Sequence, residues 1–483
     1  MENLQEKHEA QRGLQNRHIQ LIAIAGTIGT GLFLGAGKTI QMTGPSVIFA
    51  YILIGIAMFF FLRTIGEMLY NDPSQHSFLN FVTKYSGVRT GYFTQWSYWL
   101  VIVFVCISEL TAIGTYIQFW LPQVPLWLIE IVMLALLFGL NTLNSRFFGE
   151  TEFWFAMIKV AAIIGMIVTA IILVAGNFHY STVLSGKTVH DSASLNNIFD
   201  GFQLFPHGAW NFVGALQMVM FAFTSMEFIG MTAAETVNPK KSLPKAINQI
   251  PVRILLFYVG ALLAIMAIFN WHYIPADKSP FVMVFQLIGI KWAAALINFV
   301  VLTSAASALN SSLFSATRNM YSLAQQHDKG RLTPFTKLSK AGIPINALYM
   351  ATALSLLAPV LTLIPQIKNA FDFAASCTTN LFLVVYFITL YTYWQYRKSE
   401  DYNPKGFLTP KPQITVPFIV AIFAIVFASL FFNADTFYPA LGAIVWTIFF
   451  GLYSHYKKIY ASHLFLDRVT SEKLNEKAYN IIL

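Results

Sequence analysis

The sequence predicts an all-α membrane protein with twelve transmembrane helices. Of its 483 residues, 56% are hydrophobic and only 11% are charged, and the mean hydropathy is +0.59. A water-facing globule cannot bury this share of apolar side chains. Apolar runs of about 20 residues, the length that crosses a hydrocarbon core of roughly 30 Å, recur along the chain. Each run must be helical, because lipid offers no water to unpaired backbone groups and the period-two pattern of a membrane barrel is absent.

The predicted spans follow one another through short connections. In chain order they cover residues 19–41, 45–68, 92–120, 126–143, 153–175, 210–234, 254–271, 292–320, 347–364, 371–394, 417–432 and 438–453. Residues 19–395 thus form a core of ten helices and residues 413–456 hold two more. The tails 1–18 and 457–483 and the loop 396–412 lie outside the membrane. The longest loop on the other side, 176–207, is too short and polar to bury a core of its own, so we expect no enzyme domain.

Basic residues set the predicted orientation. Of 31 Lys and Arg residues, two lie inside spans and all but five of the rest fall on the side that holds both termini. The five on the other side are Lys38, Lys187, Lys278, Lys291 and Lys368. The positive-inside rule therefore predicts a multi-pass protein of the cell membrane with both termini cytoplasmic. The net charge of +9 then reflects topology, and we expect the lipid bilayer rather than nucleic acid as its partner.

No metal or cofactor site is predicted. Cys106 and Cys377 both fall inside apolar segments, which argues against a disulfide framework or a cysteine metal cluster. The histidines show no metal-ligand spacing.

The first span contains a glycine-rich interruption, Gly26-Thr27-Ile28-Gly29-Thr30-Gly31. Glycine weakens a helix, and free backbone at membrane depth is tolerated only where it lines an enclosed cavity. An unwound segment here would direct backbone N–H groups, at the positive end of a half-helix, toward an anionic group. Small-residue helix packing, with Gly31 and Gly35 in GxxxG spacing, is the alternative. A phosphate loop is disfavoured, because the glycine order is GxxGxG and no strand precedes it.

The sixth span has a matching interruption. Small polar residues and an acid break its apolar pattern in Phe221-Ala222-Phe223-Thr224-Ser225-Met226-Glu227. Carbonyls exposed near Phe221 and Thr224 could accept hydrogen bonds from an ammonium group, so two broken helices together suit a zwitterion. Spans one and six are five crossings apart, as expected for two five-helix repeats of opposite orientation around a midplane site.

Several ionisable residues lie within the spans. Lys159 in the fifth span either faces a cavity, where it could couple proton movement to binding, or extends its amine to the interface. Glu109 and Glu227 lie deep, and each either takes part in gating or makes a structural hydrogen bond between helices. Glu67 and Glu235 lie near span ends, where they could be interfacial.

Three long segments resemble the amino acid permeases of the amino acid–polyamine–organocation superfamily. They are RHIQLIAIAGTIGTGLF at the start, FAFTSMEFIGMTAAETVNPKKSLPKAIN in the middle and NFVVLTSAASALNSSLFSATRNMYSLA in the eighth span. The resemblance implies a five-plus-five inverted repeat with broken helices 1 and 6, two extra C-terminal helices, and proton-coupled amino acid uptake by alternating access.

The resemblance also implies roles for individual residues. It assigns the substrate carboxylate to the backbone of Ile28, Gly29, Thr30 and Gly31, and the amino group to the carbonyls of Phe221 and Thr224. Lys159 matches the family's proton-coupling lysine, and Glu227 matches an acid implicated in transport; Glu109 is a candidate gating residue. Where many relatives have glycine, this chain has Thr224-Ser225, which could narrow the pocket or offer Ser225 as a hydroxyl.

Within the family, ETVNPKKSLPKAIN, KSPFV and INFVVLTSAASALNS are most similar to the permeases of D-serine, D-alanine and glycine. We therefore expect proton symport of a small neutral amino acid. Aromatic or cationic substrates, a passive channel and a non-transporting amino acid sensor remain the alternatives.

Overall fold

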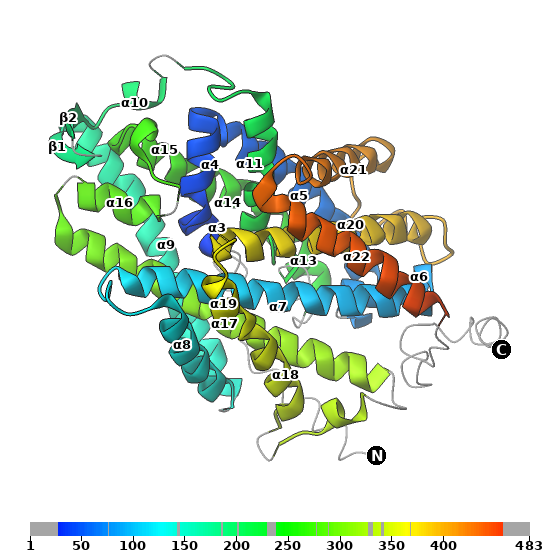
Figure 1. The fold of residues 1–483 in the computed structure, drawn as a ribbon. Helices are drawn as coiled ribbons and strands as arrows, with labels where there is room; N and C mark the ends of the chain where they lie inside the picture. Colours follow the sequence, from blue (N-terminus) through cyan, green and yellow to red (C-terminus); the bar gives the residue numbers. More distant parts are fainter. Residues whose placement is uncertain are drawn as a thin grey trace.

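Long apolar helices make up most of the chain (Figure 1). The computed structural model describes residues 28–75, 77–142, 145–184, 187–199, 202–228, 238–276, 278–287, 289–326, 332–339, 342–367 and 369–456. In its first half the main helices are α3 (Thr30–Phe33), α4 (Gly35–Thr43), α5 (Val47–Asn71), α6 (Phe78–Ser86), α7 (Val88–Gln118), α8 (Leu126–Asn141), α9 (Ser145–Ala175), α10 (Asn196–Phe199) and α11 (Ala209–Ala222).

The second half continues in the same way. Its main helices are α13 (Pro239–Asn248), α14 (Ile250–Arg253), the π-helix η3 (Ile254–Val259), α15 (Gly260–Ile268), α16 (Pro280–Leu287), α17 (Lys291–Gln326), α18 (Ile345–Ser355), α19 (Leu357–Leu363), α20 (Ala370–Tyr396), α21 (Pro412–Ser429) and α22 (Ala434–Tyr456). Short 3₁₀ turns are η1 (Gly44–Ser46), η2 (Pro73–Gln75), η4 (Trp271–Tyr273) and η5 (Thr333–Thr336).

The helices have the length and composition of membrane spans. Within the described residues, nine helices are long and apolar enough to cross a bilayer, and α8 and α11 are shorter apolar helices. Large apolar side chains on the outer faces of α8, α9 and α22 are exposed, as expected where a helix meets lipid. The chain is therefore a multi-pass membrane protein. The count of twelve crossings and the inverted repeat stay predictions, and residues 19–27 of the first predicted span lie outside the described residues.

One turn separates the first two predicted spans. Gly44 follows α4 with a φ of 57°, a left-handed conformation that glycine adopts without steric cost. A side chain at this position would approach the rings of Pro206 and Trp271. Gly44 thus allows the chain to reverse from α4 into α5 where the sequence predicts a boundary.

The longest helices form the centre of the bundle. In Figure 1, α7 crosses the molecule; it packs along α17 and α20 and also contacts α8. On another side of the molecule, α11 packs against α4, α5 and α20. This arrangement brings α3, α7, α11 and α17, which are far apart in sequence, around one interior point.

One detail lies beyond the predicted all-α class. A two-stranded antiparallel hairpin, β1 (His179–Leu184) and β2 (Lys187–Ser192), occupies the loop after α9. Its Tyr180 ring stacks on Phe269 at the end of α15, with ring centroids 5.4 Å apart. The polar segment after the sixth predicted span contains helix α13, which buries Leu243 and Ile247 and exposes its lysines.

Candidate functional site

A helix begins inside the glycine-rich segment of the first predicted span. Ile28 and Gly29 are not helical, Gly29 is extended with φ −118° and ψ −163°, and α3 begins at Thr30. The backbone N–H groups of Thr30 and Gly31 therefore lie in a first helical turn, where no earlier carbonyl of the helix accepts them. The hydroxyl of Ser304 on α17 lies 3.4 Å from the Ile28 carbonyl and donates to it.

The sixth helix is interrupted at the predicted residues. Helix α11 ends at Ala222 and residues 223–226 form turns. Ser225 has a φ of 68°, which is uncommon for a residue other than glycine. Ser225 thus takes the left-handed conformation that glycine would adopt more readily at this break.

The start of α3 and the end of α11 lie against each other. A Cβ atom placed on Gly31 would lie 2.5 Å from the Cα atom of Ala222, and one on Gly35 would lie 2.8 Å from the sulfur of Met218. Glycine is needed at position 31 because a backbone atom is the neighbour. The GxxxG packing alternative therefore also describes the structure: Gly31 and Gly35 pack on α11 while Gly29 lies in the break.

A small cavity lies between the broken helices. Its volume is about 60 Å³. The residues lining it are Gly29, Gly31, Val105, Glu109, Phe221, Ala222, Thr224, Ser225, Phe228, Ala308, Ser311 and Ser312. Five of the seven predicted substrate-binding residues are among them, and Ile28 and Thr30 are not. The residues of α7 and α17 were missed, except Glu109, because a single sequence does not show which face of an apolar helix meets a partner.

Glu109 lies in the wall of this cavity. Its side chain is 4% exposed, and its Oε1 atom accepts a hydrogen bond of 3.0 Å from the Thr30 hydroxyl. The same oxygen would lie 3.1 Å from a Cβ atom on Gly29. The Oε2 atom is buried and has no hydrogen-bond partner among the described residues. A buried acceptor in this position is expected to be completed by a ligand or water.

Lys159 is buried inside the bundle. Its side chain is 2% exposed, and its ammonium lies 3.5 Å from the Ser307 hydroxyl of α17. The amine therefore does not extend to the membrane interface, which removes the interfacial alternative. Lys159 is also close enough to Glu109 for their charges to interact.

Glu227 connects helices instead of lining the cavity. It is fully buried, and its two oxygens accept hydrogen bonds of 2.9 Å each from the hydroxyls of Tyr98 on α7 and Tyr386 on α20. This geometry matches the structural alternative for Glu227. Of the other acids, Glu235 lies outside the described residues, and Glu67 is buried near the end of α5.

The Phe221 carbonyl was predicted to be exposed to a substrate ammonium, but it is already hydrogen-bonded. It accepts hydrogen bonds from the Thr224 amide at 3.0 Å and from the Thr224 hydroxyl at 2.7 Å. Both of its lone pairs are used in this conformation. The Thr224 hydroxyl therefore stabilises the break and competes with any substrate amine for this carbonyl.

Comparison with known proteins identifies the family. Residues 18–460 match the family model described as amino acid permease. The chain is 95% identical over 459 residues to the serine permease SerP1 of Lactococcus lactis subsp. cremoris (strain MG1363), covering 95% of this chain and 100% of that protein. It is 62% identical over 454 residues to the DL-alanine permease SerP2 of the same strain, with coverage of 94% and 97%.

A more distant relative belongs to the same group. The D-serine/D-alanine/glycine transporter of Escherichia coli (strain K12) is 41% identical over 445 residues, which cover 91% of this chain and 93% of that protein. The match to the family thus covers almost the whole chain and includes the three long segments that resemble amino acid permeases. The chain belongs to the amino acid permease family and is a membrane transporter, not an enzyme.

Proposed function

We propose that this chain imports small neutral amino acids, serine and alanine above all, across the cell membrane by proton symport. The observation that carries the proposal is the cavity beside α3 and α11, whose walls combine small residues with four hydroxyls, those of Thr224, Ser225, Ser311 and Ser312. Its volume of about 60 Å³ is far below the roughly 300–1,000 Å³ of common ligand pockets. A lining made largely of small residues favours a substrate with a small side chain over arginine or phenylalanine. The substrates named for the relatives point the same way.

The main-chain groups of the substrate would be held from two sides. The first-turn amide of Gly31, next to the extended Gly29, is available to a carboxylate. The amide of Thr30 interacts with the Glu109 carboxylate in this conformation. The unpaired Oε2 atom of Glu109 and the carbonyl of Thr224 are available to an ammonium. Charge-assisted bonds of this kind are roughly twice as strong as neutral ones. In this arrangement the charged main-chain groups of the substrate are bound from two sides, and the substrate side chain contacts the small residues of the cavity wall.

Lys159 is the proposed proton carrier. Its ammonium lies beside Ser307 on α17 and within electrostatic range of Glu109. Gain or loss of a proton at Lys159 changes the potential at the Glu109 carboxylate, and with it the affinity for a substrate amine. Proton binding and substrate binding are then linked, as symport requires.

The transport cycle would be alternating access. We propose that residues 19–395 form the inverted-repeat core, that residues 413–456 add two peripheral helices, and that both termini are cytoplasmic. The facing interruptions of helices 1 and 6 support this proposal, because transporter sites lie at the interface of two repeats.

A counterflow assay tests the substrate class. Proteoliposomes loaded with unlabelled serine, alanine, glycine, arginine or phenylalanine are placed in labelled serine, and exchange is followed. We expect exchange with the three small amino acids only. Exchange with arginine or phenylalanine would overturn the size argument, and no exchange with any amino acid would favour a sensor or a channel.

A further inference from the structure

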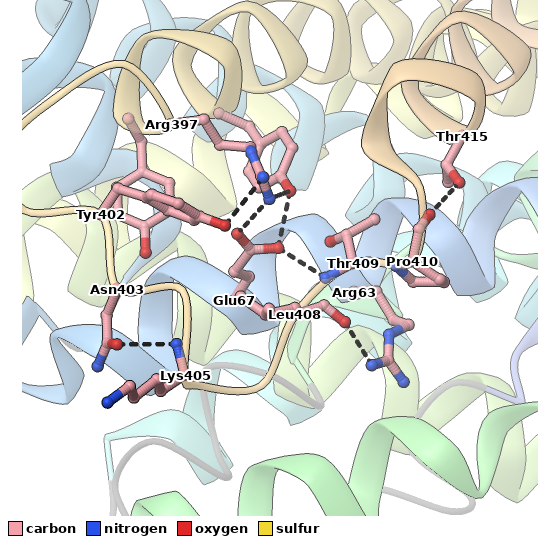
Figure 2. Close-up of polar contacts among 12 residues, drawn as sticks. Arg63, Glu67, Arg397, Tyr402, Asn403, Lys405, Leu408, Thr409, Pro410 and Thr415 are labelled. Atoms are coloured by element: carbon pink, nitrogen blue, oxygen red, sulfur yellow. Dashed lines mark hydrogen bonds and ion pairs between the residues drawn. The ribbon is translucent and has the colours of Figure 1, made fainter.

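A buried acid far from the cavity joins two helices to a loop. Glu67 lies near the end of α5 and is 2% exposed. Figure 2 shows its carboxylate surrounded by donors: Arg397 at 3.0 Å, the Tyr393 hydroxyl at 2.7 Å and the backbone N–H of Thr409 at 2.7 Å. Two of these donors come from α20 and its end, and the third comes from the loop that follows.

The same loop is fastened to α5 one turn earlier. Arg63 donates one hydrogen bond to the Leu408 carbonyl and another, of 2.8 Å, to Asn248 at the end of α13. Its guanidinium also lies 4.1 Å from the centre of the Phe407 ring. Arg63 therefore connects the loop to α13, which follows the sixth span in the chain.

A third attachment lies at the start of the loop. The carboxylate of Asp401 accepts hydrogen bonds of 2.9 Å from Lys84 and Tyr85 on α6. Its backbone carbonyl accepts one of 2.7 Å from Asn71 at the end of α5. We call residues 397–411 the strap, because these contacts hold the segment across the ends of α5, α6 and α13.

Helix α20 relates the strap to the substrate site. Tyr393, which binds Glu67, lies seven residues after Tyr386, which binds Glu227. Two helical turns, or about 10 Å, separate them on the same face. Tyr386 also packs on Phe61 of α5, with ring centroids 4.2 Å apart. Packed side chains thus connect α5 and α20 to Glu227, just after the end of α11.

We propose that the strap holds this face of the carrier closed and that Glu67 is the positioning residue through which it does so. The inference rests on the proposed alternating-access function. When the face opens, the ends of α5 and α13 separate from α20 and the strap, and the bonds to Glu67 and Arg63 break. Their strength then sets the equilibrium between closed and open states, because packed interfaces switch between discrete arrangements.

The test uses Glu67→Gln, which keeps the size of the side chain but removes the charge that Arg397 pairs with. The matched control is Glu130→Gln, since Glu130 is a fully buried acid on α8 that accepts from Thr362 on α19, away from the strap. Both changes are made together with Ser312→Cys, a reporter in the cavity wall, in a background of Cys106→Ala and Cys377→Ala. Inside-out membrane vesicles expose the predicted cytoplasmic side, where the strap lies, to a membrane-impermeant maleimide.

We expect Glu67→Gln to speed labelling of the reporter about tenfold in inside-out vesicles, since hydrogen bonds to charged groups change equilibria by about this factor or more. Labelling in right-side-out vesicles should not speed up, and Glu130→Gln should label like the reporter alone. Equal labelling of the two variants in inside-out vesicles would overturn the proposal. Faster labelling of the reporter only in right-side-out vesicles would support the proposed role of the strap and would show that the predicted orientation is reversed.

Transport kinetics separate positioning from a merely structural role. Glu67→Gln should change the KM for serine severalfold, because it shifts the population of the state that binds. A purely structural role would lower the amount of folded protein and the Vmax, with KM and labelling per molecule unchanged, and would contradict the proposal. Labelling needs no substrate, so it reports on the strap even if the protein takes up no amino acid. A lack of uptake would contradict the proposed function but not the proposed role of the strap.

Discussion

The contact between Gly31 and Ala222 yields the sharpest prediction. In Gly31→Ala, the new Cβ atom would lie 2.5 Å from the Cα atom and 2.9 Å from the nitrogen of Ala222. Carbon atoms pack best at about 3.5–4.0 Å, so α3 and α11 must move apart by about 1 Å. Overpacking of this kind costs about 1–3 kcal/mol, which corresponds to about a 5- to 150-fold loss of affinity if it all falls on the binding conformation.

Uptake of labelled serine into proteoliposomes measures this effect. We expect the KM of Gly31→Ala to rise at least about fivefold, by the same conversion. Gly35→Ala is the matched control, because its new Cβ atom would meet the Sδ and Cγ atoms of the flexible Met218 side chain instead of backbone. Adding Ala222→Gly should not rescue Gly31→Ala, since the closest contacts are to the Ala222 backbone. A native KM in Gly31→Ala, or full rescue by Ala222→Gly, would refute the reasoning.

Three further predictions follow from individual side chains. Glu109→Gln should raise the KM for serine at least about tenfold, because a charged acceptor for the ammonium is lost; an unchanged KM would remove Glu109 from the site. Lys159→Ala should leave serine exchange measurable but insensitive to a pH gradient, and proton-driven accumulation by this variant would contradict proton coupling through Lys159. Burial opposes ionisation of Asp401, but hydrogen bonds from Lys84 and Tyr85 and the Lys84 charge hold its pKa below the ordinary value. Its stabilisation is therefore present above the unfolded pKa of about 3.9 and lost as pH falls through the lower folded pKa. The Tm difference between native protein and Asp401→Asn should thus be constant from about pH 5 to 7 and shrink below about pH 4; a difference that grows as the pH falls below about 4 would contradict this.

Much of the helical layout was predictable because membrane helices are long and apolar. The predicted span 371–394 corresponds to α20, Ala370–Tyr396. The end of α11 at Ala222 and the turns at 223–226 lie where small polar residues and an acid break the apolar pattern of the sixth predicted span. The β hairpin was missed because its two strands have six residues each and lie in a polar loop.

The walls of the cavity were harder to predict. Ser311 and Ser312 lie in a helix with many small residues, and their position beside Glu109 depends on how α17 packs against α7. Glu130 was not recognised as a buried acid, although its side chain is fully buried and bonded to Thr362 on α19. Periodicity shows that a helix is apolar, but the neighbours of each face are set by tertiary packing alone.

The most direct test of the central claim is uptake of labelled serine into proteoliposomes under an imposed inward proton gradient. The account predicts accumulation of serine above its outside concentration, loss of accumulation with a protonophore, and competition by alanine and glycine but not by arginine or phenylalanine. Uptake that never exceeds the outside concentration, or that ignores the protonophore, would contradict proton symport through this site.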